Sequence, residues 1–129
     1  MLAIVDYGAG NLQSVKKALE YIGAAAEVTA DPAVIARASG VLLPGVGSFG
    51  DTMESLRRRG LEAPLRLAAD GSRPFLGICL GQQLLFAASE ESPGVAGLGV
   101  LPGRVLRLPP GEGRKVPHMG WNSLRLTAH

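Results

Sequence analysis

The amino-acid sequence predicts an α/β fold, with an open and mostly parallel sheet that carries helices on both faces. Four short apolar runs alternate with segments of helical spacing up to about Ala88, which is the pattern of successive strand–helix–strand units. Three of the runs end in loops rich in glycine, and no internal repeat or interdomain linker interrupts the alternation. With 129 residues, 47% of them hydrophobic, the chain has the size and composition of one globular domain.

The first part of the chain supplies three strands and the helices between them. Strands are expected at three short apolar or β-branched runs, residues 2–5, 26–29 and 41–43. A helix is expected at residues 11–22, where apolar side chains recur on one face and Gly23 ends the pattern. A second helix starts at Asp31-Pro32, with Asp31 as its cap and Pro32 in its first turn.

Two more helices precede the fourth strand. Ser48 or Asp51 can cap a helix that runs to Arg59, and a further helical stretch is expected at residues 61–69. The fourth strand is expected at the apolar run of residues 75–78.

The only cysteine of the chain stands where this strand gives way to a helical pattern. The segment reads Gly77-Ile78-Cys79-Leu80-Gly81, the cysteine form of the G-x-S-x-G nucleophile elbow. The glycines remove side chains that would collide where strand and helix meet, and the helix is expected to continue to about Ala88. Two interpretations are open: Cys79 is a covalent nucleophile, or it is a small buried hydrophobic residue, as many free cysteines are. The glycine spacing favours the nucleophile.

The character of the sequence changes after Ser92, where glycine and proline separate short Val/Leu runs. Residues 100–101 and 104–108 are expected to form an antiparallel hairpin, and residues 122–127 another strand. The predicted fold is therefore a parallel α/β sheet with a C-terminal antiparallel hairpin extension.

Composition and charge argue against several classes of function. A net charge of +2 is too small, and the arginines are too dispersed, to indicate nucleic-acid binding. One cysteine excludes an internal disulfide and fits a reducing compartment. Neither a signal peptide nor an apolar run long enough to span a bilayer is visible, so we expect a cytoplasmic protein.

Three glycine-rich loops leave the carboxyl ends of predicted strands, where ligands bind in parallel sheets. Gly8-Ala9-Gly10 follows the first strand, and on its own it could be only a tight turn. The loop of residues 44–47 follows the third strand, and it either ends that strand or supplies donors to an oxyanion. Beside a nucleophile, the candidate donors are the backbone amides of Gly45, Val46 and Leu80.

Five motifs spread over nearly the whole chain share a known pattern. They read IVDYGAGN from Ile4, LPGVGSF from Leu43, GICLGQQLL from Gly77, SEE from Ser89 and KVPHMGWN from Lys115. With these motifs the chain resembles the class I glutamine amidotransferases, whose fold is flavodoxin-like. Within that family it is similar to the glutaminase subunits of imidazole glycerol phosphate synthase.

The resemblance implies an activity and roles for particular residues. Cys79 would attack the side-chain amide of glutamine and form a thioester while ammonia leaves. Gln83 and Glu91 fall on family positions that hold the glutamine, and Gly45 and Leu80 fall on the oxyanion loop and the elbow amide. The resemblance implies neither a cofactor nor a metal.

The same resemblance implies a heterodimer with a (β/α)₈ cyclase subunit. That partner receives the ammonia and makes imidazole glycerol phosphate and an aminoimidazole carboxamide ribotide in histidine biosynthesis. The positions that match family regions facing the partner are Asn11, Pro117, His118, Met119, Gly120, Trp121 and Asn122. Asn11 can also be a helix N-cap and Trp121 a core residue, and both assignments are compatible with an interface role.

A cysteine amidotransferase also needs a general base, which the resemblance places in a His-x-Glu stretch. The chain has two histidines, His118 and His129, and neither is followed by a glutamate two residues on. His118 matches the interface segment, and the terminal His129 is expected to be untethered. We therefore expect one amidotransferase domain that is incomplete, truncated before its catalytic histidine and glutamate, with little activity on its own.

Two alternative functions stay open. One is another class I amidotransferase subunit, such as one that feeds pyridoxal phosphate, anthranilate or GMP synthesis, against which the block of residues 117–122 argues. The other is a non-catalytic scaffold of the same fold, which the absent base supports.

Overall fold

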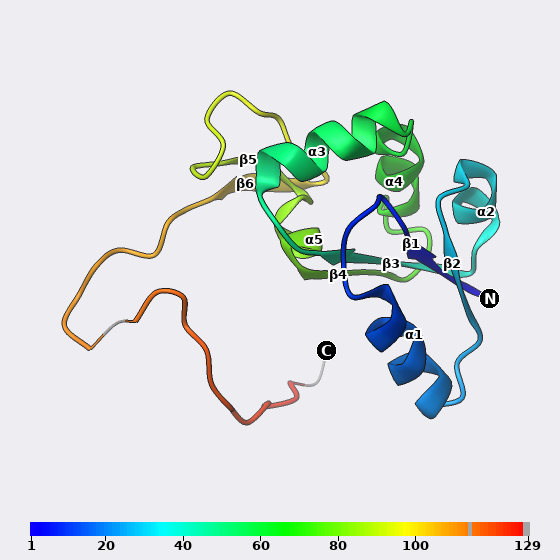
Figure 1. Cartoon of the computed structure of the whole chain (residues 1–129), viewed down its shortest axis with the longest axis horizontal. Helices are drawn as coiled ribbons and strands as arrows, with labels where there is room; N and C mark the ends of the chain where they lie inside the picture. Colours follow the sequence, from blue (N-terminus) through cyan, green and yellow to red (C-terminus); the bar gives the residue numbers. More distant parts are fainter. Residues whose placement is uncertain (114, 128–129) are drawn as a thin grey trace.

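The computed structural model describes residues 1–113 and 115–127, and its main sheet is parallel and four-stranded (Figure 1). The strands are β1 (Leu2–Val5), β2 (Ala26–Thr29), β3 (Gly40–Gly45) and β4 (Phe75–Cys79), in the spatial order β2-β1-β3-β4. All neighbouring pairs in this sheet are parallel. The predicted open parallel sheet is confirmed, and the strand order makes β4 an edge strand.

Helices cover both faces of the sheet because parallel strands must be joined by crossovers. One face carries α1 (Leu12–Tyr21), and the other carries α3 (Phe49–Arg58) and α4 (Glu62–Ala68), with α2 (Pro32–Arg37) packed against α4 (Figure 1). The main core lies between the sheet and the helices α2, α3 and α4. Its buried residues include Val5, Ile35, Leu43, Phe49, Met53, Leu56 and Leu65.

Local capping groups start the helices where the sequence predicts them. Asn11 Oδ1 accepts the Ser14 amide at 3.3 Å at the start of α1, and Asp31 caps α2. Of the two candidates for α3, Ser48 is the N-cap, since its Oγ accepts the Asp51 amide at 3.2 Å and donates to Asp51 Oδ2 at 2.7 Å. These side chains satisfy amides that have no acceptor within the helix.

The helix after Cys79 is shorter than predicted. It spans only Leu80–Gln83 (α5), and the strand β5 (Phe86–Ser89) occupies residues that the sequence assigns to the same helix. The cause is a segment farther along the chain: Leu98 donates its amide to the Leu84 carbonyl at 2.7 Å, and its neighbours donate to the next carbonyls. In a continuing helix these carbonyls would instead accept amides four residues ahead.

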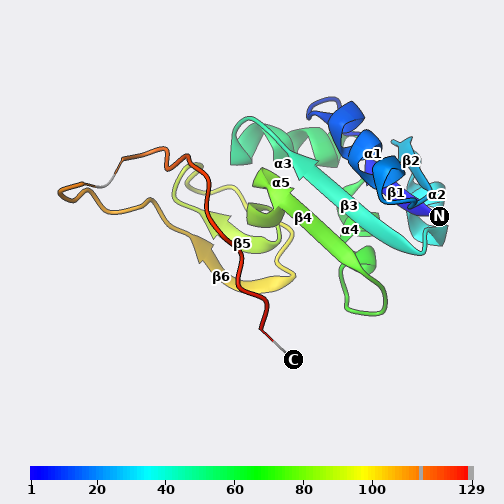
Figure 2. The same cartoon turned by 90° about the horizontal axis from the view of Figure 1, so that it is seen from below.

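The predicted antiparallel hairpin is wrong. A single strand, β6 (Leu101–Val105), stands in its place and pairs parallel with β5, and Figure 2 shows this small sheet next to α5. Pro102 and Gly103 do not form a turn but lie at a register shift in the ladder, where Gly103 has a φ of +98°. Glycine adopts this left-handed conformation without steric cost, so the break is absorbed as a bulge within one strand.

The chain after β6 is extended and exposed. Residues 106–113 and 115–127 contain no helix or strand, so the strand predicted at residues 122–127 is not formed. We call these residues the C-terminal segment, which runs away from β6 and then turns back toward the rest of the molecule (Figure 1). Among the described helices, none combines the length and the apolar character that a membrane crossing needs.

Candidate active site

Cys79 occupies the point where β4 ends and α5 begins. Its backbone has a φ of 55° and a ψ of −119°, and it is the one described residue other than glycine with a positive φ. Such a conformation costs an L-residue about 1–3 kcal/mol, and residues held in it cluster at active sites. The cysteine is exposed, so the strained turn presents the sulfur to solvent. The alternative that Cys79 is a buried hydrophobic residue is therefore wrong.

Three glycines allow β3, β4 and α5 to approach closely enough to form this turn. A Cβ on Gly77 would lie 2.6 Å from the Cα of Gln82, and a Cβ on Gly81 would overlap the carbonyl oxygen of Leu43. A side chain on Gly45, at the end of β3, would overlap the backbone of Gly81 in the same way. These neighbours are backbone atoms, which cannot move aside as a flexible side chain can. Close packing therefore requires the glycines of the G-x-C-x-G pattern.

The candidate oxyanion donors lie at the elbow, but one of them is already engaged. Gly45 pairs with Cys79 in the register of β3 and β4, and Leu80 is the first residue of α5, where amides have no acceptor within the helix. Val46 follows Gly45 directly, but its amide donates to the hydroxyl of Tyr7 at 3.2 Å. The Val46 N–H is therefore committed to another residue in this structure.

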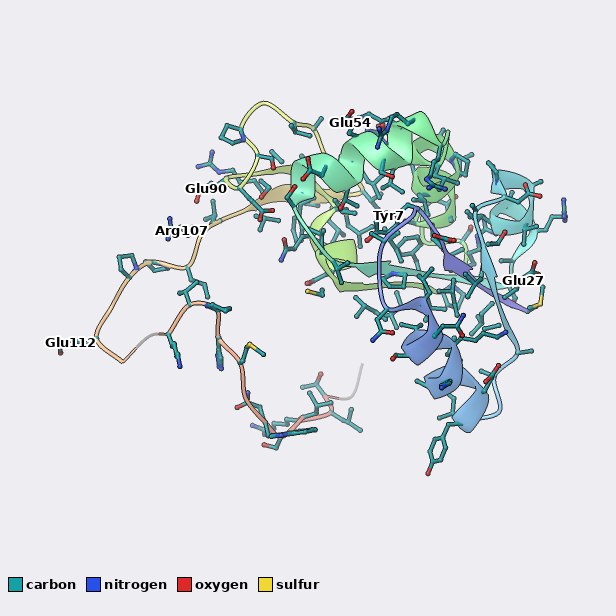
Figure 3. All side chains as sticks on the ribbon, viewed as in Figure 1. Tyr7, Glu27, Glu54, Glu90, Arg107 and Glu112 are labelled. Atoms are coloured by element: carbon teal, nitrogen blue, oxygen red, sulfur yellow. The ribbon has the colours of Figure 1, made fainter. Side chains whose placement is uncertain are left out.

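Tyr7 belongs to the motif that begins at Ile4, but the sequence alone indicates no function for it. In the structure it lies between the end of β1 and α3 (Figure 3). It is 2% exposed, and Ser55 Oγ of α3 donates to its carbonyl oxygen at 2.7 Å. Burial raises the pKa of the Tyr7 hydroxyl, and charge on Cys79 raises it further. Hydrogen bonds with the Val46 amide and the Thr52 side chain lower this pKa, but the net shift is upward. The hydroxyl is thus neutral at physiological pH and lies within electrostatic reach of the sulfur.

Gln83 and Glu91, the predicted ligands of glutamine, line the same hollow of about 840 Å³. Gln83 ends α5, and Glu91 follows β5. The Glu91 carboxylate also accepts the Phe49 amide at 2.8 Å, and a negative charge is favourable there because Phe49 begins α3. Since α3 starts shortly after the loop of residues 44–47, Glu91 connects the hollow to the candidate oxyanion loop.

We expect Glu91→Ala to lower the free energy of unfolding by about 1–2 kcal/mol. The part-buried Phe49 amide would lose its acceptor, and the start of α3 would lose a favourable charge. Urea denaturation measures the change, and Glu54→Ala, at an exposed position on the same helix, is the control with an expected change below about 0.5 kcal/mol. Equal stability of the two variants would contradict a capping role for Glu91.

The predicted interface residues fall in two separate parts of the chain. Asn11 is the N-cap of α1. Residues 117–122 belong to the C-terminal segment, and because Trp121 is 103% exposed, core packing of this residue is wrong. His118 lies in the same exposed segment, and His129 lies outside the described residues.

Comparison with known proteins gives a consistent result. The sequence matches the family described as glutamine amidotransferase class-I over residues 3–127. It is 58% identical to imidazole glycerol phosphate synthase subunit HisH of Moorella thermoacetica over 124 residues, which cover 96% of this chain and 58% of that protein. It is 54% identical to the subunit of the same name from Methanothermobacter thermautotrophicus over 124 residues, or 96% of this chain and 61% of that protein.

The fold has a counterpart among solved structures. A crystal structure of a glutamine amidotransferase aligns with a TM-score of 0.69 and 26% sequence identity, covering 88% of this chain and 59% of that one. The chain therefore spans less than two thirds of the length of each of these relatives.

Proposed function

Because the chain belongs to the class-I glutamine amidotransferase family, we propose that Cys79 is the nucleophile that releases ammonia from the side-chain amide of glutamine. The backbone of Cys79 carries this proposal: a strained turn with a φ of 55° presents an exposed cysteine between a strand and a helix, as in a nucleophile elbow. The close approach of backbone at Gly45, Gly77 and Gly81 supports the same assignment.

The reaction is expected to pass through a covalent intermediate on the sulfur. The sulfur bonds to the amide carbon while the carbonyl electron pair moves onto oxygen. Collapse of this adduct re-forms the carbonyl and breaks the C–N bond, the nitrogen takes the proton given up by the thiol and leaves as ammonia, and a γ-glutamyl thioester remains. Water then attacks the thioester carbon and releases glutamate and the thiol. We assign the Leu80 amide to the oxyanion, with the Gly45–Val46 loop as the second source of donors, each worth typically about 3 kcal/mol.

The same proposal places the amino-acid end of glutamine in the hollow lined by Gln83 and Glu91, with the side-chain amide directed toward Cys79, which does not itself line the hollow. A carboxylate can accept several hydrogen bonds, so Glu91 can hold the Phe49 amide and still pair with the ammonium group of the substrate. We do not assign the general base to His118, because it lies in the exposed C-terminal segment without a glutamate two residues on. Since a general base typically contributes about 10²–10⁴-fold, the chain on its own is expected to turn glutamine over slowly.

We further propose that the chain acts as the glutaminase subunit of imidazole glycerol phosphate synthase and passes ammonia to a (β/α)₈ cyclase partner in histidine biosynthesis in the cytoplasm. Two relatives with this subunit name support the assignment, since they are 58% and 54% identical to the chain. Met119 and Trp121 in the C-terminal segment are 86% and 103% exposed, and large apolar side chains of this kind anchor protein interfaces. Asn11 is the proposed contact from α1.

A chloroketone analogue of glutamine tests the proposed nucleophile. We expect it to alkylate Cys79 about tenfold or more faster than it alkylates free cysteine, because a bound substrate analogue is held near the sulfur. L-glutamine should slow the labelling and D-glutamine should not, and intact mass spectrometry measures both. Cys79→Ala is the control, since the chain has no second cysteine. Labelling at the rate of free cysteine, without protection by L-glutamine, would refute the proposal.

A further inference from the structure

We propose that Tyr7 is a positioning residue of the amidotransferase site, whose hydroxyl holds the Val46 amide and so withholds one candidate oxyanion donor from the substrate. This inference rests on the proposed function. It concerns a side chain that does not itself touch the reacting atoms but controls a group that can.

The hydrogen bond from Val46 to Tyr7 makes the two uses of this amide mutually exclusive. The Val46 N–H donates to Tyr7 Oη at 3.2 Å, across 39 residues of sequence. A backbone amide carries one hydrogen, so while it is bound to Tyr7 it cannot donate to a negatively charged oxygen at Cys79. Leu80, at the start of α5, is then the elbow amide left to serve the oxyanion.

The tyrosine side of this hydrogen bond is buried, and the loop side is half exposed. Tyr7 is 2% exposed, and Ser55 Oγ fixes its carbonyl at 2.7 Å. Val46 is 50% exposed, and the next residue, Gly47, has a φ of +94° and a position where an added Cβ would meet nothing within 4 Å. The bond therefore breaks by rotation of the Val46 peptide rather than by movement of the phenol ring.

The two interactions differ in strength. Loss of one neutral hydrogen bond shifts an equilibrium by about threefold to tenfold, whereas one oxyanion donor is worth about 10²–10³-fold in rate. An oxyanion can therefore draw the Val46 amide away from Tyr7. The affinity for a ligand that forms this oxyanion is then lowered by the free energy of the hydrogen bond to Tyr7. Removing the Tyr7 hydroxyl should therefore raise the affinity for such a ligand by the same factor.

The test compares Tyr7→Phe with the wild-type chain. An aldehyde analogue of glutamine adds reversibly to Cys79: the S–C bond forms, the carbonyl electron pair moves onto oxygen, and that oxygen takes the thiol proton. We expect Tyr7→Phe to bind this aldehyde about threefold to tenfold more tightly and to exchange its Val46 amide hydrogen about tenfold faster. Iodoacetamide, which needs no oxyanion donor, should alkylate both proteins at the same rate. Tyr21→Phe is the matched control, because Tyr21 is 92% exposed.

Amide exchange read by NMR separates the possible failures. If Tyr7→Phe binds the aldehyde but its Val46 amide exchanges at the wild-type rate, the role of Tyr7 is overturned and the proposed function stays in place. The same conclusion follows if the amide exchanges faster but the variant binds the aldehyde no more tightly than the wild-type chain. Absence of aldehyde binding by both proteins overturns the proposed function and this inference with it. If Tyr7→Phe does not fold, the wild-type chain decides: a Val46 amide that exchanges as fast as that of Gly47 refutes the hydrogen bond.

Discussion

Replacing Cys79 by glycine is expected to abolish glutamine turnover and at the same time to stabilise the fold. Activity should fall to the uncatalysed background, because the chain has no other cysteine to form the thioester. The free energy of unfolding should exceed that of Cys79→Ala by about 1 kcal/mol, because glycine adopts this conformation without the strain that a Cβ causes. A gain in stability coupled to complete loss of activity is the signature of a strained nucleophile.

Cys79→Ala is the control that separates these two effects. Alanine removes the sulfur but keeps a Cβ at a φ of 55°, so it should be inactive without the gain in stability. Glutamate release by the chain together with the proposed cyclase partner measures turnover, and urea titration measures stability. A glycine variant less stable than the alanine variant would contradict the strained turn. Turnover near the wild-type rate in either variant would exclude Cys79 as the nucleophile.

Gly81→Ala is expected to have the largest effect on stability of any single methyl group added to the elbow. The new Cβ would overlap the Leu43 carbonyl oxygen, so α5 or β3 would have to move. Over-packing a core typically costs 1–3 kcal/mol, and because the obstacle here is backbone, we expect a loss of about 3 kcal/mol or more. The displaced elbow should also lose its rapid labelling by the chloroketone analogue.

Gly120→Ala is the matched control for this substitution. Gly120 lies in the C-terminal segment, and a Cβ built there meets nothing within 4 Å, so its stability should change by less than about 0.5 kcal/mol. Urea denaturation of both variants, together with the chloroketone labelling rate, measures the difference. A Gly81→Ala protein with wild-type stability would show that β3 and α5 are not in close backbone contact.

Features that depend on neighbours in sequence were predicted well. The elbow could be located because Gly77, Cys79 and Gly81 lie within five positions, and the constraint that they satisfy is the local meeting of one strand with one helix. Asp31 followed by Pro32 marked the start of α2 for the same reason. All four parallel strands lie within about two residues of their predicted bounds, because their apolar runs are bounded by turn-forming residues.

Features that depend on distant partners were not predictable in the same way. The end of α5 is decided by the amide of Leu98, which donates to the Leu84 carbonyl in place of an amide of the helix. The residues next to Leu84 in the sequence do not indicate this distant donor. The strand β6 was misread as a hairpin because Pro102-Gly103 is as typical of a hairpin turn as of a bulge. The hydrogen bond between Tyr7 and Val46 requires β1 and β3 to be adjacent, which follows from strand order and not from motif spacing.

The meeting of β3, β4 and α5 at Gly45, Gly77 and Gly81 has a consequence for how the chain can vary. Because most of the atoms in close contact there belong to the main chain, the location of the sulfur depends little on the size and shape of the leucines and valines in the core. Exchanges among those aliphatic side chains that keep total volume are tolerated in proteins at modest cost. Many aliphatic residues of the interior can therefore change while the sulfur keeps its position. Gly45, Gly77 and Gly81 cannot change in the same way, because none of them has room for a Cβ.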